Sequence, residues 1–346
     1  MTDPVALVTA AGDDLDRLGW TTADPFPTVR VEIERRVADG SSGRLGFTYR
    51  DPARSTTPTE SWPWAQSIVV GLMTYLPHAG TATGPGRVAR FAERNHYLPL
   101  RSSMQHIADA LVGGGYRAEV VIDDSRLVDR AAAHRAGLAW WGKNTMLLTP
   151  GLGPWFLIGC VVTDAPLPDT AAMQRDCGTC SACLPACPTG ALVQPGILDA
   201  RRCLAAILQA PGDIPVEYRA AVGDRIYGCD DCIDACPPGA RLRDTATDDR
   251  GSVDPVEVLE LGDRELLARF GHFYLPGGNP RFLRRNALVV LGNVGETSHL
   301  VLLAGYLLHP DAMLQAHARW AIGTIGGPVA ERILAGVQSE GRPIGK

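Results

Sequence analysis

The chain has 346 residues, of which 45% are hydrophobic and 21% are charged, so it is long enough to bury two or three cores. Its formal net charge of −5 argues against a general nucleic-acid binder, although a local basic patch is compatible with that charge. Residues 1–14 contain no basic stretch and no pair of arginines, and the apolar runs are too short to span a bilayer. We therefore expect a cytoplasmic protein without membrane contact.

The first part of the chain mixes helix and strand patterns. Three segments have the periodicity or the glycine ending of helices: 28–38, 96–112 and 130–137. Three apolar runs are typical of buried strands: 67–75, 116–122 and 155–163. Residues 76–85 are rich in Gly, Pro and Thr and predict a loop. The mixture predicts an α+β fold for a first domain, residues 1–165.

A proline-rich link at 164–169 leads to a second predicted domain, residues 166–245, which holds most of the cysteines. A polar link is expected at 241–252, followed by a helical domain at 246–346. Within that domain, 284–295 and 317–327 share a basic start, an apolar helix face and a glycine near the end. Two such pieces predict a short HEAT-like repeat, in which stacked helix pairs complete each other's core.

Eight of the nine cysteines fall in two runs with the spacing of iron–sulfur proteins. The first run is Cys177-x2-Cys180-x2-Cys183-x3-Cys187-Pro188, and the second is Cys229-x2-Cys232-x3-Cys236-Pro237. The first matches the bacterial ferredoxin pattern, in which the fourth cysteine ligates the other cluster. The second run has one cysteine fewer, and Cys203 is available as the substitute. In a cytoplasmic protein this clustering favours metal ligation over disulfides.

The symmetric assignment gives a ferredoxin-like module with two [4Fe–4S] clusters. One would be held by Cys177, Cys180, Cys183 and Cys236, and the other by Cys187, Cys203, Cys229 and Cys232. A pair of structural zinc sites is the alternative, but this spacing fits zinc poorly. The ninth cysteine, Cys160, lies on an apolar strand and is expected to pack as a small buried hydrophobic side chain.

An unusual polar segment follows the predicted strand at 116–122. Asp123 at the strand end is placed to act as an acid beside a buried cofactor, because desolvation raises the pKa of a carboxyl group. The alternative is that Asp123 and Asp124 cap the following helix. Trp140 and Trp141 fit either a core or a site, and Lys143 fits a structural role, a phosphate contact or a partner for Asp123.

Nine stretches spread over nearly the whole chain carry a family resemblance: 22–25 (TADP), 86–91 (GRVARF), 129–137, 142–145 (GKNT), 177–192, 198–203 (LDARRC), 223–236, 284–293 and 321–326 (AIGTIG). On these stretches the chain resembles the cobalamin- and iron–sulfur-dependent epoxyqueuosine reductases of tRNA maturation. A ferredoxin module alone would match only the middle of the chain.

The resemblance implies a cob(II)alamin between the first domain and the cluster module. Cluster electrons would reduce it to a Co(I) nucleophile that removes the epoxide oxygen of epoxyqueuosine at the tRNA wobble position. It implies Asp123 as the proton donor and Arg54, Leu147, Thr149 and Ile158 as corrin contacts. The implied partners are tRNA and an external electron donor such as flavodoxin or ferredoxin, and we expect a monomer.

Some positions depart from the family pattern on the cofactor or substrate side: His96, Leu98, Cys160, Ala205 and the pair Pro238-Gly239, where the family has Trp-Asn or Leu-Asn. A paralogue that acts on another electrophile therefore remains open. Two other functions also remain open, a reductive dehalogenase-like enzyme and a non-catalytic iron–sulfur electron-transfer protein. In the helical domain, Arg281, Arg284 and Arg285 fit either a phosphate-binding cluster or a solvated helix face.

The ligand assignment predicts the iron content of a variant. Cys203→Ala should retain about four irons per chain after anaerobic reconstitution, against about eight for the unaltered protein, because one of two clusters loses a ligand. Metal analysis of the desalted protein measures this. Zinc in place of iron, or a full iron complement in the variant, would contradict the assignment.

Overall fold

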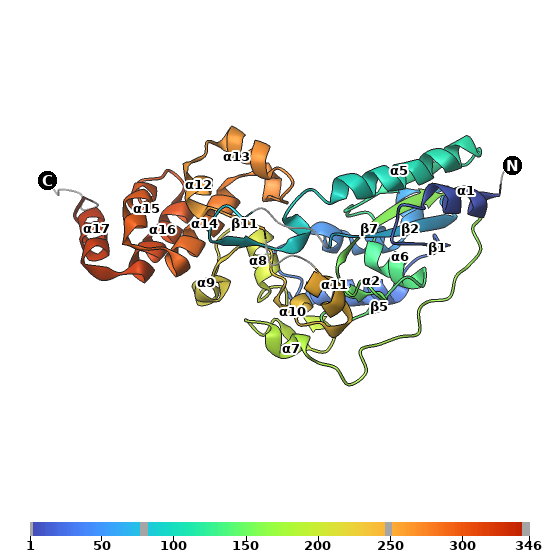
Figure 1. Ribbon diagram of the computed structural model, residues 1–346, viewed down its shortest axis with the longest axis horizontal. Coiled ribbons are helices and arrows are strands. Elements are labelled where there is room, and N and C mark those ends of the chain that lie inside the picture. The colour runs from blue at the N-terminus through green and yellow to red at the C-terminus, as the bar shows by residue number, and fades with distance from the viewer. Residues whose placement is uncertain (1–2, 77–81, 246–250, 341–346) are drawn as a thin grey trace. The chain divides into compact units, whose positions relative to one another are not determined.

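The computed structural model describes residues 3–76, 82–245 and 251–340 and divides into two compact units (Figure 1). Unit 1 comprises Met1–His78, Asn95–Arg201 and Asp231–Thr247, and unit 2 comprises Ala79–Arg94, Arg202–Asp230 and Asp248–Lys346. Each unit is made of three separate segments, whereas the predicted domains are consecutive ranges that meet at residues 165 and 245. The predicted domain boundaries therefore stay a prediction.

Unit 1 is built on a four-stranded antiparallel sheet in the order β1-β2-β7-β4. Its strands are β1 (Arg17–Thr22), β2 (Ser67–Thr74), β7 (Phe156–Thr163) and β4 (Ala118–Val121). The two central strands pair along their whole length, from Ser67 opposite Thr163 to Thr74 opposite Phe156. Both are apolar on both faces, as expected for strands that are covered on both sides.

Helices cover the two faces of this sheet. On one face α5 (Tyr97–Gly113) packs against β7 and β4, with α1 (Pro4–Ala11) beside it. The approach is close, because a Cβ atom on Gly159 would lie 2.6 Å from the Cγ atom of Met104 in α5. On the other face α6 (Asp129–Arg135) packs against β7 and shares a core with Cys160.

Unit 1 also contains shorter elements around the sheet and the cysteines. These are α2 (Pro27–Ala38), η1 (Phe47–Tyr49), α3 (Pro52–Thr56), α4 (Pro58–Ser61), β5 (Trp140–Trp141), β6 (Leu147–Leu148), α7 (Cys183–Ala186), β8 (Leu192–Gln194), β9 (Ile197–Leu198), α10 (Asp231–Asp234), η3 (Pro237–Gly239) and α11 (Ala240–Thr245). Several of these helices begin on a proline, whose fixed φ and missing N–H suit the first helical position.

Unit 2 is mostly helical. A small sheet in the order β10-β3-β11 joins β10 (Arg225–Tyr227), β3 (Gly86–Val88) and β11 (Ser252–Val253). Its helices are η2 (Arg90–Ala92), α8 (Leu204–Gln209), α9 (Val216–Val222), α12 (Pro255–Glu260), α13 (Asp263–Phe270), η4 (Pro276–Gly278), α14 (Arg281–Val294), η5 (Thr297–His299), α15 (Leu300–Tyr306), α16 (Ala312–Ile325) and α17 (Gly327–Glu340). The centre is α14, which packs against α8, α9, α12, α16 and β10.

The predicted helices and strands of the first part are confirmed to within a few residues. The predicted pieces 284–295 and 317–327 fall in α14 and α16, which pack on each other. The polar link at 241–252 is wrong in its first part, since α11 is helical to Thr245, and residues 246–250 lie outside the described residues. Part of the predicted loop, 77–81, lies outside them too.

The basic cluster expected on α14 is also wrong. Arg285 is fully buried, and Arg284 is 9% exposed with its guanidinium 2.5 Å from the carboxylate of Asp263. Only Arg281 reaches the surface, where it lies 3.5 Å from Asp311. Two of the three guanidinium groups are therefore part of the interior of unit 2, neither a phosphate site nor a solvated face.

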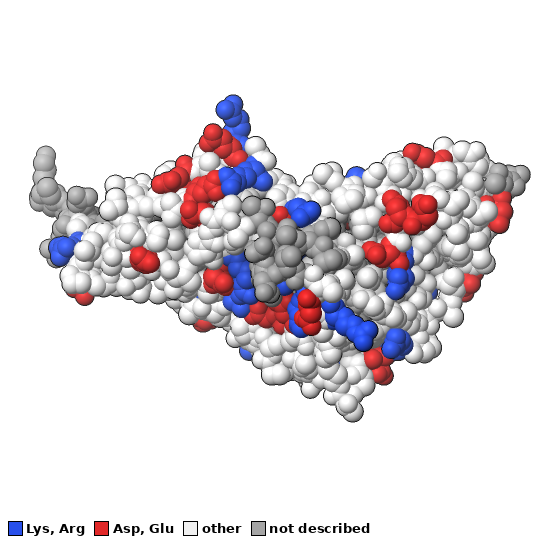
Figure 2. Space-filling view, viewed as in Figure 1, with Lys and Arg blue, Asp and Glu red and all other residues white. Residues whose placement is uncertain are grey.

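Basic and acidic side chains are intermixed on the face shown in Figure 2. Along α2, charged side chains pair within the helix, as Arg30 does with Glu34 at 2.8 Å and Arg36 with Glu32 at 2.7 Å. Such exposed pairs add little stability. Within the described part of the chain, no helix combines the length and the apolar character needed to cross a membrane.

Packing of α14 on α16 predicts a stability effect. A Cβ atom at Gly292 would lie 2.5 Å from the Trp320 ring and 2.9 Å from the Cα atom of Ala321. Gly292→Val should therefore force the helices apart and lower the free energy of unfolding by about 1–3 kcal/mol, measured by urea denaturation. Gly305→Ala in α15 is the control, since its Cβ atom meets nothing within 4 Å. Equal midpoints for Gly292→Val and the parent would contradict this packing.

Candidate functional site

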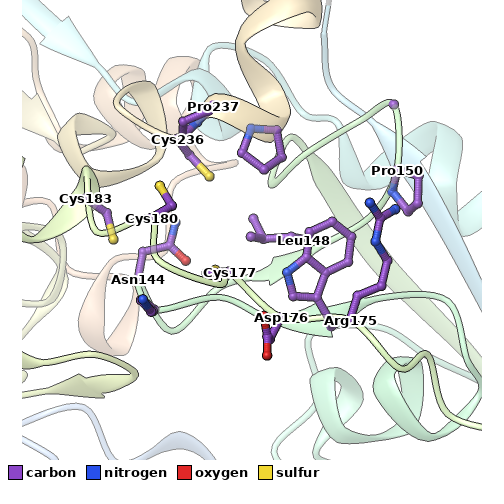
Figure 3. A pocket seen from close by; sticks show the side chains of 14 residues that line it. Asn144, Leu148, Pro150, Arg175, Asp176, Cys177, Cys180, Cys183, Cys236 and Pro237 are labelled. Carbon is purple, nitrogen blue, oxygen red and sulfur yellow. The ribbon is translucent and has the colours of Figure 1, made fainter.

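Four of the predicted cluster ligands line one cavity of about 490 Å³ in unit 1: Cys177, Cys180, Cys183 and Cys236 (Figure 3). Cys177 and Cys180 lie on the loop that precedes α7, and Cys183 is the first residue of that helix. Cys236 follows α10, which packs against α7. Burial and the neighbouring cysteines raise the pKa of the Cys236 thiol to about 12, so the four thiols are close enough to interact. Four thiolates around one cavity can ligate one [4Fe–4S] cluster.

The cavity wall also presents hydrogen-bond donors. The Nε1 atom of Trp140 and the Nδ2 atom of Asn144 are buried, and neither has a hydrogen-bond partner among the described residues. Buried donors are almost always paired, so an acceptor is expected here. The sulfide and thiolate sulfurs of a [4Fe–4S] cluster are such acceptors, and hydrogen bonds to them tune its potential. The cavity therefore fits this cofactor.

Lys143 has a structural role at this cavity. Its Nζ atom donates a hydrogen bond to the carbonyl of Gly178, 2.7 Å away, between the first two cysteines of the run. From the other side Asp176 accepts the backbone N–H of Gly178 at 2.6 Å. These two hydrogen bonds help to hold the loop that carries Cys177 and Cys180. Trp141, in contrast to buried Trp140, is 42% exposed.

The other four predicted ligands are divided between the units. Cys187 and Cys232 belong to unit 1, Cys203 and Cys229 to unit 2, and all four are half-buried. Their joint ligation of a second cluster stays a prediction. In the described part of the chain, no three His, Cys, Asp or Glu side chains gather closely enough to hold a single metal ion.

Asp123 has a strained backbone. Its φ is +50°, a left-handed conformation that is uncommon for residues other than glycine and that clusters at functional sites. It lies just beyond Val121, where β4 stops pairing with Cys160 of β7. Part of the side chain is exposed, yet loss of hydration raises the pKa of Asp123, and the like charge of Asp129 raises it further. Arg130 acts in the opposite direction.

The helix-capping interpretation of this segment is wrong. The N-cap of α6 is Val128, and no side chain caps it. Asp124 accepts the backbone N–H of Arg126 at 2.8 Å and pairs with its guanidinium at 2.7 Å, which lowers the pKa of Asp124. The two neighbouring carboxyl groups thus have opposite pKa shifts, and only that of Asp123 favours the protonated form.

The residues predicted to contact the corrin have unequal access. Arg54 on α3 is exposed, donates to Ser61 Oγ at 3.0 Å and lies near enough to Asp124 to lower its pKa. Ile158 is half-buried on β7, just past the end of its pairing with β4. Leu147 and Thr149 are buried, and the Oγ1 atom of Thr149 has no partner among the described residues.

One observation bears on a bound group here. The Oγ1 atom of Thr149 is buried without a partner among the described residues, and a group bound nearby would satisfy it. Leu147 lies in the core of unit 1. The assignment of all four as corrin contacts stays a prediction.

Other positions are clarified by burial. Cys160 is confirmed as a buried free cysteine, and desolvation raises the pKa of its thiol well above the ordinary value. Asn144 and Asp129 were not singled out from the sequence. Asn144 lies in the GKNT stretch and Asp129 is the first residue of the 129–137 stretch. Both stretches carry the family resemblance, so that resemblance could have pointed to these two residues.

The charges around Asp123 predict opposite effects of two variants. Asp129→Asn removes a like charge and should lower the pKa of Asp123, whereas Arg130→Gln removes an opposite charge and should raise it. Titration of carboxyl carbons by NMR, in protein with labelled aspartate, measures both. A shift in the same direction in the two variants would show that these charges do not act on Asp123.

Comparison with known proteins places this site in context. Residues 176–239 match a family model described as a 4Fe-4S double cluster binding domain. The epoxyqueuosine reductase of Bacillus subtilis is 32% identical over 94% of this chain and 88% of its own length. That of Xanthomonas campestris pv. campestris is 35% identical over 84% of this chain and 87% of its own.

Solved structures agree with these relatives. An epoxyqueuosine reductase with a tRNA-Tyr epoxyqueuosine-modified stem loop has a TM-score of 0.83 at 29% identity, covering 99% of this chain and 94% of that one. Another, from Bacillus subtilis, is described with an aspartate catalytic loop swung out of its active site and has a TM-score of 0.81 at 29% identity, with the same coverage. The similarity extends over units 1 and 2 alike, and the chain belongs to the epoxyqueuosine reductase family.

Proposed function

We propose that the protein reduces epoxyqueuosine to queuosine at the wobble position of tRNA, using cob(I)alamin fed by two [4Fe–4S] clusters. The observation that carries this proposal is a cavity lined by four cysteines in a chain that matches epoxyqueuosine reductases over 94% of its length. A relative of this fold binds an epoxyqueuosine-modified tRNA stem loop, which supports tRNA as the substrate here.

The overall reaction sets what the protein must supply. Removing the epoxide oxygen breaks two C–O bonds, forms one C=C bond and releases the oxygen as water, so two electrons and two protons are consumed. When bound, cobalamin would supply the nucleophilic electron pair that opens the epoxide, and Arg54, Leu147, Thr149 and Ile158 are the residues proposed to hold it. The clusters and an external donor, such as flavodoxin or ferredoxin, would supply the electrons.

Asp123 is proposed to supply a proton to the departing oxygen. An alkoxide is a poor leaving group, and a carboxylic acid within hydrogen-bond reach neutralises it as the C–O bond breaks. The raised pKa keeps that carboxyl protonated at a higher pH than an ordinary aspartate. The left-handed backbone of Asp123 holds its carboxyl group just beyond Val121, where the pairing of β4 with β7 ends.

The finer features of the architecture belong to the same proposal. We assign residues 1–165 to cobalamin binding and catalysis, 166–245 to the clusters and 246–346 to a HEAT-like helical domain. The pairing of α14 with α16 and of α15 with both α16 and α17 supports the helical repeat. A cytoplasmic monomer that meets its tRNA and electron donor in solution fits the proposed activity.

The proposed function is tested by reconstitution. The protein is loaded anaerobically with iron, sulfide and cobalamin, reduced, and given tRNA bearing epoxyqueuosine, and the digested nucleosides are analysed by mass spectrometry. Appearance of queuosine is expected. Corrin binding without turnover of that tRNA would instead indicate a paralogue acting on another electrophile.

Replacing the proposed acid should remove most of the activity. Asp123→Asn keeps the size of the side chain but supplies no acidic proton, so turnover should fall at least about 100-fold. In the parent enzyme the rate should decline as pH rises through the raised pKa of Asp123, because the protonated form is then lost. Asp124→Asn is the matched control and should keep most of the turnover. Equal losses in the two variants would contradict the role of Asp123.

A further inference from the structure

Two buried polar side chains on α14 have no part in the proposed chemistry. Arg285 and Asn286 are both 0% exposed, in the middle of the helix that forms the centre of unit 2. Burying a guanidinium and an amide is costly unless every donor is paired. Their partners therefore indicate which parts of unit 2 they hold.

Arg285 binds the C-terminal end of α8. Its guanidinium donates to main-chain carbonyls at and just beyond that end: Ile207 at 3.3 Å, Leu208 at 3.0 Å, Ala210 at 2.9 Å, and Gly212. These include carbonyls that have no partner within the helix, and they form the negative end of its dipole. Asn286 holds the guanidinium in place, since its Oδ1 atom accepts from Nε and Nη2 at 3.1 and 2.9 Å.

Asn286 connects α8 to β10. Its Nδ2 atom donates to the carbonyl of Leu208 in α8 and to that of Ile226 in β10, at 3.0 Å in each case. Both polar atoms of this amide are thus used: Nδ2 donates two hydrogen bonds and Oδ1 accepts two. The pair fixes α8 and β10 relative to one another through α14.

Both of those elements lead directly to a predicted cluster ligand. Cys203 is the N-cap residue of α8, and its carbonyl accepts the N–H of Ile207 at 2.8 Å. Cys229 follows β10 after Gly228, which has a φ of +72°. A Cβ atom added to Gly228 would lie 2.5 Å from the Cβ atom of Ala89, so this turn requires glycine. Small movements of α8 or β10 would therefore change the separation of the two thiols.

We propose that Arg285 and Asn286 are positioning residues for the second [4Fe–4S] cluster, setting the separation of Cys203 and Cys229 by fixing α8 and β10 to α14. The inference rests on the proposed function, in which these two cysteines ligate that cluster. It concerns residues that touch neither cluster nor substrate.

The test compares iron content and spectra in variants of the full chain. Asn286→Ala removes both hydrogen bonds that connect α8 to β10 and favours the helix, and Arg285→Lys keeps the charge but loses the fork. The control is Arg284→Gln, which lies on the same helix and pairs with Asp263 instead. Each protein is reconstituted anaerobically and examined by iron analysis, electron paramagnetic resonance after reduction, circular dichroism and thermal unfolding.

We expect Asn286→Ala to retain about four of about eight irons, or to show one of two reduced-cluster signals altered, with native helix content. Cys203→Ala provides the reference iron content and spectra of a protein with one cluster. The iron content of Arg285→Lys should lie between that of Cys203→Ala and that of the parent. The control should keep both clusters.

Three results would overturn the inference. The first is eight irons with unchanged spectra in both variants, even if their melting temperatures fall. The second is equal loss of both clusters. The third is insoluble protein in both variants with a soluble control, which would show that the pair holds the whole unit. A parent protein that binds two clusters but makes no queuosine would defeat the proposed function alone.

Discussion

Bringing cysteines from two distant parts of the chain around one cavity is the constraint on which unit 1 depends. Cys236 joins three cysteines that lie more than 50 residues earlier, so the segment that follows it must be held against the rest of unit 1. Gly239 provides this, because its carbonyl accepts the Nε1 hydrogen of Trp155 at 3.2 Å and its main chain lies against Gly153. A Cβ atom on Gly153 would be 2.3 Å from the Cα atom of Gly239, so the contact requires two glycines. The cavity is therefore anchored to the start of β7, the central strand of the sheet.

The same sheet determines the electrostatics of Asp123. Because β4 stops pairing at Val121 while β7 continues, the chain beyond β4 is free to turn, and Asp123 adopts a left-handed conformation there. The turn brings its carboxyl near Asp129 at the start of α6 and near Arg130. One neighbour raises the pKa and the other lowers it, so the acidity of Asp123 depends on the balance of two charges rather than on burial alone.

Much of this was predictable from local patterns, and the failures have two causes. The strand at 155–163 and the helices of the first part follow from apolar periodicity, and the cysteine runs follow from spacing. The first concerns Arg284 and Arg285, which were expected at the surface because arginines at the start of a helix are usually exposed to solvent. Both are buried. The carbonyls that compensate buried Arg285 come from α8, far away in the sequence. The second cause is local: aspartate is a common N-cap residue, but Asp124 pairs with Arg126 only two residues along, before α6 begins at Asp129.

Burial also changes how the departures from the family pattern are interpreted. Cys160 is 0% exposed within the core of unit 1, so the departure at this position alters packing rather than a surface that a substrate reaches. Gly239 is required by its close contacts with Gly153 and Trp155, and Pro238 beside it lines the cysteine cavity. The differences at Cys160 and Gly239 are thus explained by the packing that holds the cavity and the sheet together. Because neither is needed to accommodate a different electrophile, they are compatible with the same tRNA nucleoside as in the family, and the argument for a changed substrate has to rest on other positions.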